Sequence, residues 1–210
     1  TPLPEMTGIG ALFDISGKYI LYCTTLSRKD LWLYDGTTHR NIVPYNEKNW
    51  MQAFKISGDY VVWQHGGGLL DQGIFLYSIT AGTISRLDDP DNPYYAEVPD
   101  IDFPYVAWED GVTVNCPEFS VRGQVLIHNI QTGTRTTSAG DLTCEREGDQ
   151  GGRLSYPYVT FVRTAYQWDD VDEYYKQIYK GILARDLRTG TLIRLREVFG
   201  QWQPYSNLLA

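Results

Sequence analysis

The side chains of this sequence best suited to chemistry are carboxylates in two clusters. DDPDN holds Asp88, Asp89 and Asp91, and TAYQWDDVDEYYK holds Asp169, Asp170 and Asp172. Hard cations such as calcium take several carboxylate oxygens, but neither cluster has the glycine and terminal glutamate of a full calcium loop. We interpret both clusters as solvated loop charge, with calcium binding as the weaker alternative, and predict no other cofactor.

Aromatic residues share the second acidic cluster and predict a binding face rather than a catalytic one. Exposed aromatic rings stack on sugars or anchor protein partners. His65, in QHGGGLLDQG, stands beside Trp63, although a lone histidine is more often structural than functional. The predicted binding residues are His65, Tyr166, Trp168, Tyr174 and Tyr175.

Nucleophilic catalysis lacks the residues that it needs. His39, His65 and His128 are the only histidines, and they fall in separate segments. No serine stands in a strand–turn–helix elbow. A hydrolase that uses a carboxylate pair stays open, because acids are abundant and their spacing in the fold cannot be read from the sequence.

A repeat positions these residues. Four segments align as FDISGKYILYC, FKISGDYVVWQ, PDIDFPYVAWE and GRLSYPYVTFV, with anchor tyrosines Tyr19, Tyr60, Tyr105 and Tyr158. An aromatic residue follows each anchor by three positions, namely Tyr22, Trp63, Trp108 and Phe161. An apolar residue precedes each anchor by four, namely Ile15, Ile56, Ile101 and Leu154.

The second halves of the units match as well. Each gives an apolar run, a glycine-containing turn and a second run, as in GIFLYSITAGTISRL and GILARDLRTGTLIRL. Each unit therefore predicts four short strands, A to D, and units of about 40 to 50 residues with four strands are propeller blades. The chain is predicted to be one all-β domain, residues 1–210, with units at 9–45, 50–88, 95–138 and 150–196.

The tail at 197–210, which contains GQWQPYSNLLA, matches the start of a fifth strand A. Three interpretations follow: a four-bladed ring with an extra strand, part of a larger propeller, or two chains that close one ring. Proteins normally cover a naked strand edge, so we expect closure or pairing, with self-association through the terminal strands as one form of it.

Loop lengths separate the two ends of the predicted blades. The A–B turns (SGKY, SGDY, DFPY, SYPY) and the C–D turns are uniformly tight. The B–C loops lengthen along the chain, up to Glu109–Gln124 and Val162–Gly181, and the D–A connection Ser138–Gly152 is long. Long loops are usually kept for a purpose, so we expect this elaborated face to bind.

Two cysteines lie on that face. Cys116 is in the third B–C loop and Cys144 in the following D–A connection, which makes a disulfide between them geometrically plausible. It would stabilise by roughly 3 kcal/mol on chain-entropy arguments and imply an oxidising compartment. Three unpaired cysteines in a cytosolic protein are the alternative, and Cys23 is expected to be a buried thiol.

Net charge and the lengths of the apolar runs argue against nucleic-acid-binding and membrane-spanning proteins. A net charge of −8 with no basic cluster argues against nucleic acid. No run approaches the roughly 20 apolar residues of a transmembrane helix. The opening TPLPEM has neither a charged n-region nor an apolar h-region, so no signal peptide is visible, which fits a cytoplasmic protein or a mature, already cleaved one.

The pattern ISGDYVVW … GIFLYSITAGTISRL resembles the TolB-like propeller repeats of bacterial and archaeal cell-surface and periplasmic proteins. The resemblance covers essentially the whole chain, although the family's Asp after strand B is missing from most units. It implies a scaffold for partner binding or adhesion and, less often, a sugar-degrading site.

We therefore predict an extracellular, cell-surface or periplasmic propeller that is not an enzyme. It would bind a protein or a glycan through its elaborated face. The alternatives are a carbohydrate-active lyase or glycosidase that uses loop carboxylates and tyrosines, and a structural subunit of a surface array.

Overall fold

The computed structural model describes residues 13–24, 30–44, 46, 50–66, 72–91, 96–116, 119–138, 146–169 and 174–197. In these ranges the chain forms strands and turns, and they contain no helix long and apolar enough to cross a membrane. The strands form four antiparallel sheets of four strands each. The predicted all-β architecture of four four-stranded units is therefore confirmed.

Each sheet takes its strands in chain order, as a repeat of meanders requires. Blade 1 contains β1 (Phe13–Ser16), β2 (Tyr19–Tyr22), β3 (Leu31–Tyr34) and β4 (His39–Val43). Blade 2 contains β5 (Trp50–Ser57), β6 (Tyr60–Gly66), β7 (Gly73–Ser78) and β8 (Thr83–Arg86). Blade 3 contains β9 (Ala96–Asp102), β10 (Tyr105–Cys116), β11 (Phe119–Asn129) and β12 (Arg135–Thr137). Blade 4 contains β13 (Arg146–Ser155), β14 (Tyr158–Asp169), β15 (Tyr174–Asp186) and β16 (Leu192–Glu197).

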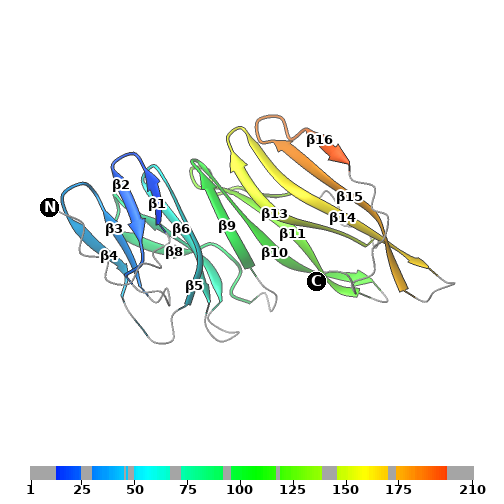
Figure 1. The fold of residues 1–210 in the computed structure, drawn as a ribbon, viewed down its shortest axis with the longest axis horizontal. Coiled ribbons are helices and arrows are strands. Elements are labelled where there is room, and N and C mark those ends of the chain that lie inside the picture. The colour runs from blue at the N-terminus through cyan, green and yellow to red at the C-terminus, as the bar shows by residue number, and fades with distance from the viewer. Residues whose placement is uncertain are drawn as a thin grey trace, which may run out of the picture.

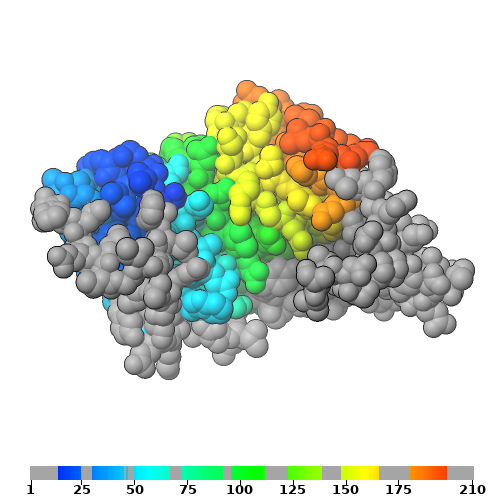
Figure 2. All heavy atoms as spheres, viewed as in Figure 1, coloured from blue at the N-terminus to red at the C-terminus, as the bar shows by residue number. Residues whose placement is uncertain are grey.

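The sheets stand side by side in a row, with blade 1 and blade 4 at its opposite ends (Figure 1). The short turns of β1–β2, β13–β14 and β15–β16 lie along the upper edge of this view. The space-filling view shows this edge running from blue residues of blade 1 to orange residues of blade 4 (Figure 2). We call it the turn edge.

The hydrophobic core consists of three layers, each between two neighbouring blades. One cluster joins blades 1 and 2, a second joins blades 2 and 3, and a third joins blades 3 and 4. The second aromatic residue of a unit supplies the largest side chain of each layer, namely Trp63, Trp108 and Phe161. All three are at most 2% exposed. Alternation of side chains along a strand gives each blade two apolar faces, and the repeat stacks one against the next.

In blade 1 the aromatic residue at the same position is Tyr22, which is buried and bonds His39 Nδ1 through its hydroxyl at 2.7 Å. Cys23 is buried in the first core layer, as predicted. At the other end of the row, Ile182, Ile193 and Leu195 of blade 4 remain 36% to 56% exposed.

The long B–C segments of units three and four, predicted as loops, are strands for most of their length. Strands β10 and β11 pair from Tyr105↔Asn129 to Cys116↔Phe119, and β14 and β15 pair from Tyr158↔Asp186 to Asp169↔Tyr174. Backbone N–H and C=O groups need partners, and β-branched and aromatic residues favour strands. Segments such as VTVNC and TAYQWD therefore extend the hairpins. The predicted D–A connection also changes, because β13 begins at Arg146.

Candidate functional site

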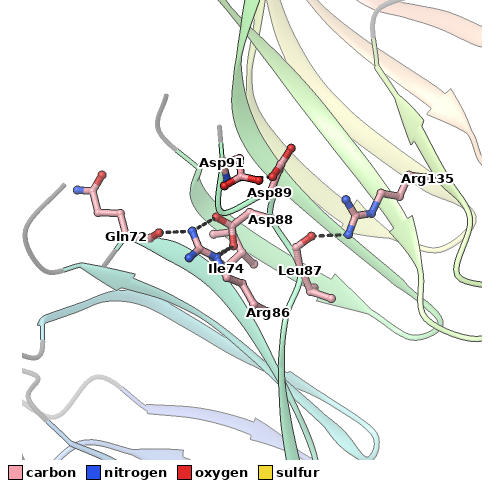
Figure 3. Close-up of polar contacts among 8 residues, drawn as sticks. All are labelled: Gln72, Ile74, Arg86, Leu87, Asp88, Asp89, Asp91 and Arg135. Atoms are coloured by element: carbon pink, nitrogen blue, oxygen red, sulfur yellow. Dashed lines mark hydrogen bonds and ion pairs between the residues drawn. The ribbon is translucent and has the colours of Figure 1, made fainter. Parts of the chain in front are cut away.

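The first acidic cluster is arranged around an arginine. Asp88 receives two bonds from Arg86, Nη2 to Oδ2 at 2.7 Å and Nε to Oδ1 at 2.9 Å, and Oδ1 also accepts the Ile74 N–H at 2.9 Å. Asp89 Oδ1 accepts the backbone N–H of Asp91 at 2.9 Å. Figure 3 shows the carboxylate of Asp88 directed at the guanidinium group. This carboxylate fastens the end of β8 to β7, and Arg86 offsets its charge.

Metal-ligating side chains do not gather in the described ranges, the first acidic cluster included. Within them no group of three His, Cys, Asp or Glu side chains is placed to hold a metal ion. Asp169 ends β14, whereas Asp170 and Asp172 lie outside the described residues. Calcium binding by the second cluster therefore stays a prediction.

The predicted binding aromatics belong to the hairpin of blade 4. Tyr166 and Trp168 are in β14, Tyr174 and Tyr175 are in β15, and the backbone register pairs Trp168 with Tyr175. The four aromatics thus lie within a short stretch of one hairpin. His65 is far from them in the sequence, at the end of β6, where its ring meets Phe75 edge-on at 5.8 Å.

Of the predicted disulfide, Cys116 ends β10 and Cys144 lies outside the described residues. The pairing remains a prediction.

Two groups of the blade 3 hairpin, the buried Asp110 and the half-buried His128, have altered pKa values. Burial raises the pKa of the Asp110 carboxyl, and a hydrogen bond from Gln124 opposes the shift. Burial lowers the pKa of His128, with a smaller contribution from the nearby Arg135 guanidinium. Both shifts favour the neutral side chain.

A different site emerges on the turn edge, from bonds that link each blade to the next. The side chain just after the apolar residue of strand A accepts a backbone N–H from the A–B turn of the following blade. Gly58 N donates to Ser16 Oγ at 3.0 Å, Phe103 N to Ser57 Oγ at 3.1 Å, and Tyr156 N to Asp102 Oδ2 at 2.7 Å. Gly58, Phe103 and Tyr156 are therefore equivalent positions of the repeat.

A second set of bonds confirms the equivalence one residue later. The carbonyl of Asp59 accepts the Ile79 N–H, that of Pro104 accepts the Ile130 N–H, and that of Pro157 accepts the Leu187 N–H, each at 2.8 Å. The A–B turns thus make the same backbone contacts in blades 2, 3 and 4, whether their central pair is Gly-Asp, Phe-Pro or Tyr-Pro.

The side chains at the equivalent positions stack on the anchor tyrosine of the preceding blade. Phe103 lies against Tyr60 with ring centroids 5.4 Å apart and planes inclined by 7°. Tyr156 lies against Tyr105 at 5.9 Å and 14°. Such offset stacked pairs contribute about 0.5–1.5 kcal/mol beyond their burial. They hold blade 2 to blade 3 and blade 3 to blade 4.

The stack is missing between blades 1 and 2. Gly58 occupies the position of Phe103 and Tyr156, and a Cβ built on it would meet nothing within 4 Å. Its φ of +56° lies in the left-handed region, which a glycine turn permits and which other residues rarely adopt. Among the described residues of blade 2, Tyr19, the anchor tyrosine of blade 1, therefore has no aromatic partner.

A groove of about 830 Å³ opens at this place. Its walls come from the A–B turns of blades 1 and 2, the C–D turn of blade 2, and Phe103 of blade 3. Its lining is Ser16, Gly17, Lys18, Tyr19, Gly58, Asp59, Tyr60, Ser78, Thr80, Ala81 and Phe103. We call it the turn groove.

Charge and ring chemistry are both available in the turn groove. The ammonium of the exposed Lys18 lies 5.2 Å from the centroid of the Tyr19 ring, within the range of a cation–π contact. Asp59 Oδ2 accepts the Thr80 hydroxyl at 3.0 Å. An apolar ring face bordered by one cation and one anion suits the recognition of a flat, partly polar ligand.

The turn groove was not predicted from the sequence, because the A–B and C–D turns are all short and look alike there. The A–B turns do carry a signal, because SGKY and SGDY have glycine where DFPY and SYPY have an aromatic residue. Only the structure shows that this position faces the anchor tyrosine of the preceding blade.

No family model and no curated protein matches the sequence. Solved structures do match in fold. A TolB-type protein from Agrobacterium tumefaciens superposes with a TM-score of 0.52 at 16% identity, over 88% of this chain and 63% of that one. A prolyl endopeptidase superposes with a TM-score of 0.52 at 11% identity, over 90% and 36%. A puromycin hydrolase superposes with a TM-score of 0.57 at 11% identity, over 90% and 28%.

The chain spans less than two thirds of each of these proteins. The four antiparallel meanders, the stacking of each sheet on the next and these superpositions agree, and together they identify the fold as that of a β-propeller, here as a row of four blades.

Proposed function

We propose that this chain is a non-catalytic recognition propeller that binds a protein or a glycan outside the cytoplasm. The observation that carries the proposal is the turn groove, where the repeat leaves the face of Tyr19 without its aromatic partner. An unfilled stacking position costs the fold an inter-blade contact and leaves an open aromatic surface, and such surfaces are typical binding anchors.

Other charged groups near the blade interfaces support binding rather than catalysis, because their contacts are structural. Asp100 Oδ2 accepts the Leu154 N–H of the next blade at 2.9 Å, and Asp14 Oδ2 accepts the Ile56 N–H at 2.9 Å. Asp149 is 1% exposed, pairs with Arg163 of its own blade, and accepts the hydroxyl of Ser138 from blade 3 at 2.7 Å. These carboxylates fasten blade to blade.

The placement outside the cytoplasm rests on the predicted Cys116–Cys144 disulfide and on the TolB-like sequence pattern. Mass spectrometry of the chain from an oxidising compartment, before and after reduction, tests the disulfide. A 116–144 cross-link supports the placement, and two free thiols at these positions contradict it.

The recognition itself is tested by screening the folded chain against a glycan array and a displayed random-peptide library. Ligands are then measured by calorimetry on Tyr19→Leu, which removes the groove platform, and on Trp168→Ala, which changes the blade 4 hairpin. We expect Tyr19→Leu to weaken binding by about tenfold, since a stacked ring is worth up to about 1.4 kcal/mol. Trp168→Ala should bind as the parent does.

Loss of binding only in Trp168→Ala would place the binding site on the blade 4 hairpin and would contradict binding in the turn groove. Failure of both screens, or conversion of a bound glycan into products, would contradict a non-catalytic recognition function.

A further inference from the structure

The occupied stacking positions of this fold indicate what would fill the empty one. In blades 3 and 4 the ring that lies on the preceding tyrosine belongs to a residue in a turn and is followed by proline, Phe103-Pro104 and Tyr156-Pro157. Twice in this molecule, the anchor tyrosine of one blade therefore binds an aromatic side chain that comes from a turn of the polypeptide.

At blade 2 the same surface is open to the outside. The turn groove includes both Tyr19 and Gly58, and the space beside Gly58 that a side chain would enter is empty to at least 4 Å. A ring from another chain can thus reach the position that Phe103 and Tyr156 fill from within.

We propose that the turn groove docks a Phe or Tyr side chain presented on a turn of a partner protein, which takes the place of the missing aromatic residue of blade 2. This inference rests on the proposed recognition function and narrows it to a polypeptide ligand. The partner ring lies parallel to Tyr19, as Phe103 lies on Tyr60.

The groove also accommodates the residues that flank such a ring. The ammonium of Lys18 lies over the Tyr19 ring, 5.2 Å from its centroid. This exposed, flexible side chain can swing aside for the incoming ring and bond an acidic neighbour of it, as the sequence Asp102-Phe103 would supply. Ser78 and Thr80 border the other side, where hydroxyl groups can bond the backbone of the partner turn. The turn sequence DFPY of this chain is thus a reasonable minimal ligand.

The probe is the synthetic peptide N-acetyl-DFPY-amide, with N-acetyl-DLPY-amide as its matched control and maltose as the test for a sugar ring. Binding is followed by nuclear magnetic resonance of the labelled chain, at the Gly58 amide and the Tyr19 ring. Stacking of the Phe ring shifts both signals upfield through its ring current. The Leu peptide and maltose should leave them in place.

Two variants locate the effect. Gly58→Tyr with Asp59→Pro gives blade 2 the turn of blade 4, fills the groove from within and should abolish the peptide shifts. Tyr19→Leu removes the platform and should lower the peptide affinity by about tenfold. Tyr105→Leu is the matched control, because Tyr105 is already covered by Tyr156, and its affinity should equal that of the parent.

The proposal is overturned if the Leu peptide shifts Gly58 as much as the Phe peptide does, if maltose alone binds there, or if no probe perturbs the groove at millimolar concentration. It is also overturned if Tyr19→Leu binds unchanged. A glycan that binds on the array and is lost in Tyr19→Leu would leave the recognition function standing and remove only the polypeptide ligand.

Discussion

Removal of the Asp149 carboxylate should destabilise the junction of blades 3 and 4 severely. Both carboxylate oxygens bond Arg163, Oδ1 to Nε at 2.8 Å and Oδ2 to Nη2 at 2.9 Å, and Oδ2 also accepts the Ser138 hydroxyl at 2.7 Å. Ser138 in turn accepts the Val125 N–H at 3.0 Å. One buried acid therefore connects the end of blade 3 to two strands of blade 4.

The expected loss in the free energy of unfolding follows from breaking the ion pair between Asp149 and Arg163. The side chains of Asp149 and Arg163 are 2% and 17% exposed, and breaking a buried ion pair costs about 3–5 kcal/mol because the remaining charge is uncompensated. Arg163 can reach water through its exposed part, so we expect the lower end, about 3 kcal/mol. With a urea m value of about 3 kcal/mol/M for a chain of this size, the unfolding midpoint should fall by about 1 M.

Urea unfolding followed by tryptophan fluorescence measures this change, and a paired substitution separates the charge from the packing. Asp149→Leu with Arg163→Met removes both charges and should cost less than Asp149→Ala alone. A loss below about 1 kcal/mol in Asp149→Ala, or a double variant that is worse than the single one, would refute the reasoning.

Three further outcomes are expected. Gly152→Ala should cost about 1–3 kcal/mol in urea unfolding, because its Cβ would lie 2.6 Å from Val125 Cγ1, and adding Val125→Ala should restore part of the loss; an unchanged midpoint in Gly152→Ala would contradict this contact. Asp110→Asn should be more stable than the parent at pH 7, because burial raises the pKa of this carboxyl and its ionised form is costly in the folded state. That advantage should shrink as the pH falls through the ordinary aspartate pKa of about 4 and be gone below about pH 3, where the carboxyl is protonated in both states. An advantage that persists there would exclude ionisation as its cause. Phe103→Ala should lower the free energy of unfolding by at least about 0.5–1.5 kcal/mol through loss of its stack on Tyr60, and a neutral result would show that the ring contact contributes nothing.

Much of the fold could be predicted from the sequence, because the repeat consists of apolar and aromatic residues at the positions that a strand buries. The aromatic residue three positions after each anchor tyrosine marks an inward face, and Trp63, Trp108 and Phe161 indeed fill the three core layers. Glycine turns marked the C–D hairpins, where Gly82, Gly133 and Gly190 adopt positive φ.

The long hairpins were predicted as loops because their strand signal is interrupted. Gly111 and Gly123 lie opposite each other in β10 and β11, and glycine in a strand lowers its apparent propensity. The pairing that holds them there comes from the neighbouring strand and is invisible in either segment alone.

The turn groove could not be predicted because it depends on contacts between units. Whether Gly58 is a mere turn residue or an absent stacking partner is decided by Ser16, which lies in the preceding blade and bonds its N–H. Sequence alignment of the units shows the glycine but not the ring that faces it. The Asp88–Arg86 pair was missed for a related reason, since the acids were read as a group and their basic neighbour was not considered.

The central claim, that blade 2 lacks an aromatic residue for which the fold retains space, is tested most directly without any ligand. Gly58→Tyr combined with Asp59→Pro restores the blade 4 turn and keeps the carbonyl that accepts the Ile79 N–H. Thermal unfolding of this variant should show a gain of about 0.5–1.5 kcal/mol, a rise of roughly 2–4 °C per kcal/mol. Gly58→Tyr alone should be less stable than the pair, because it keeps a left-handed turn. A paired variant that unfolds below the parent, with no upfield shift of the Tyr19 ring, would contradict the account.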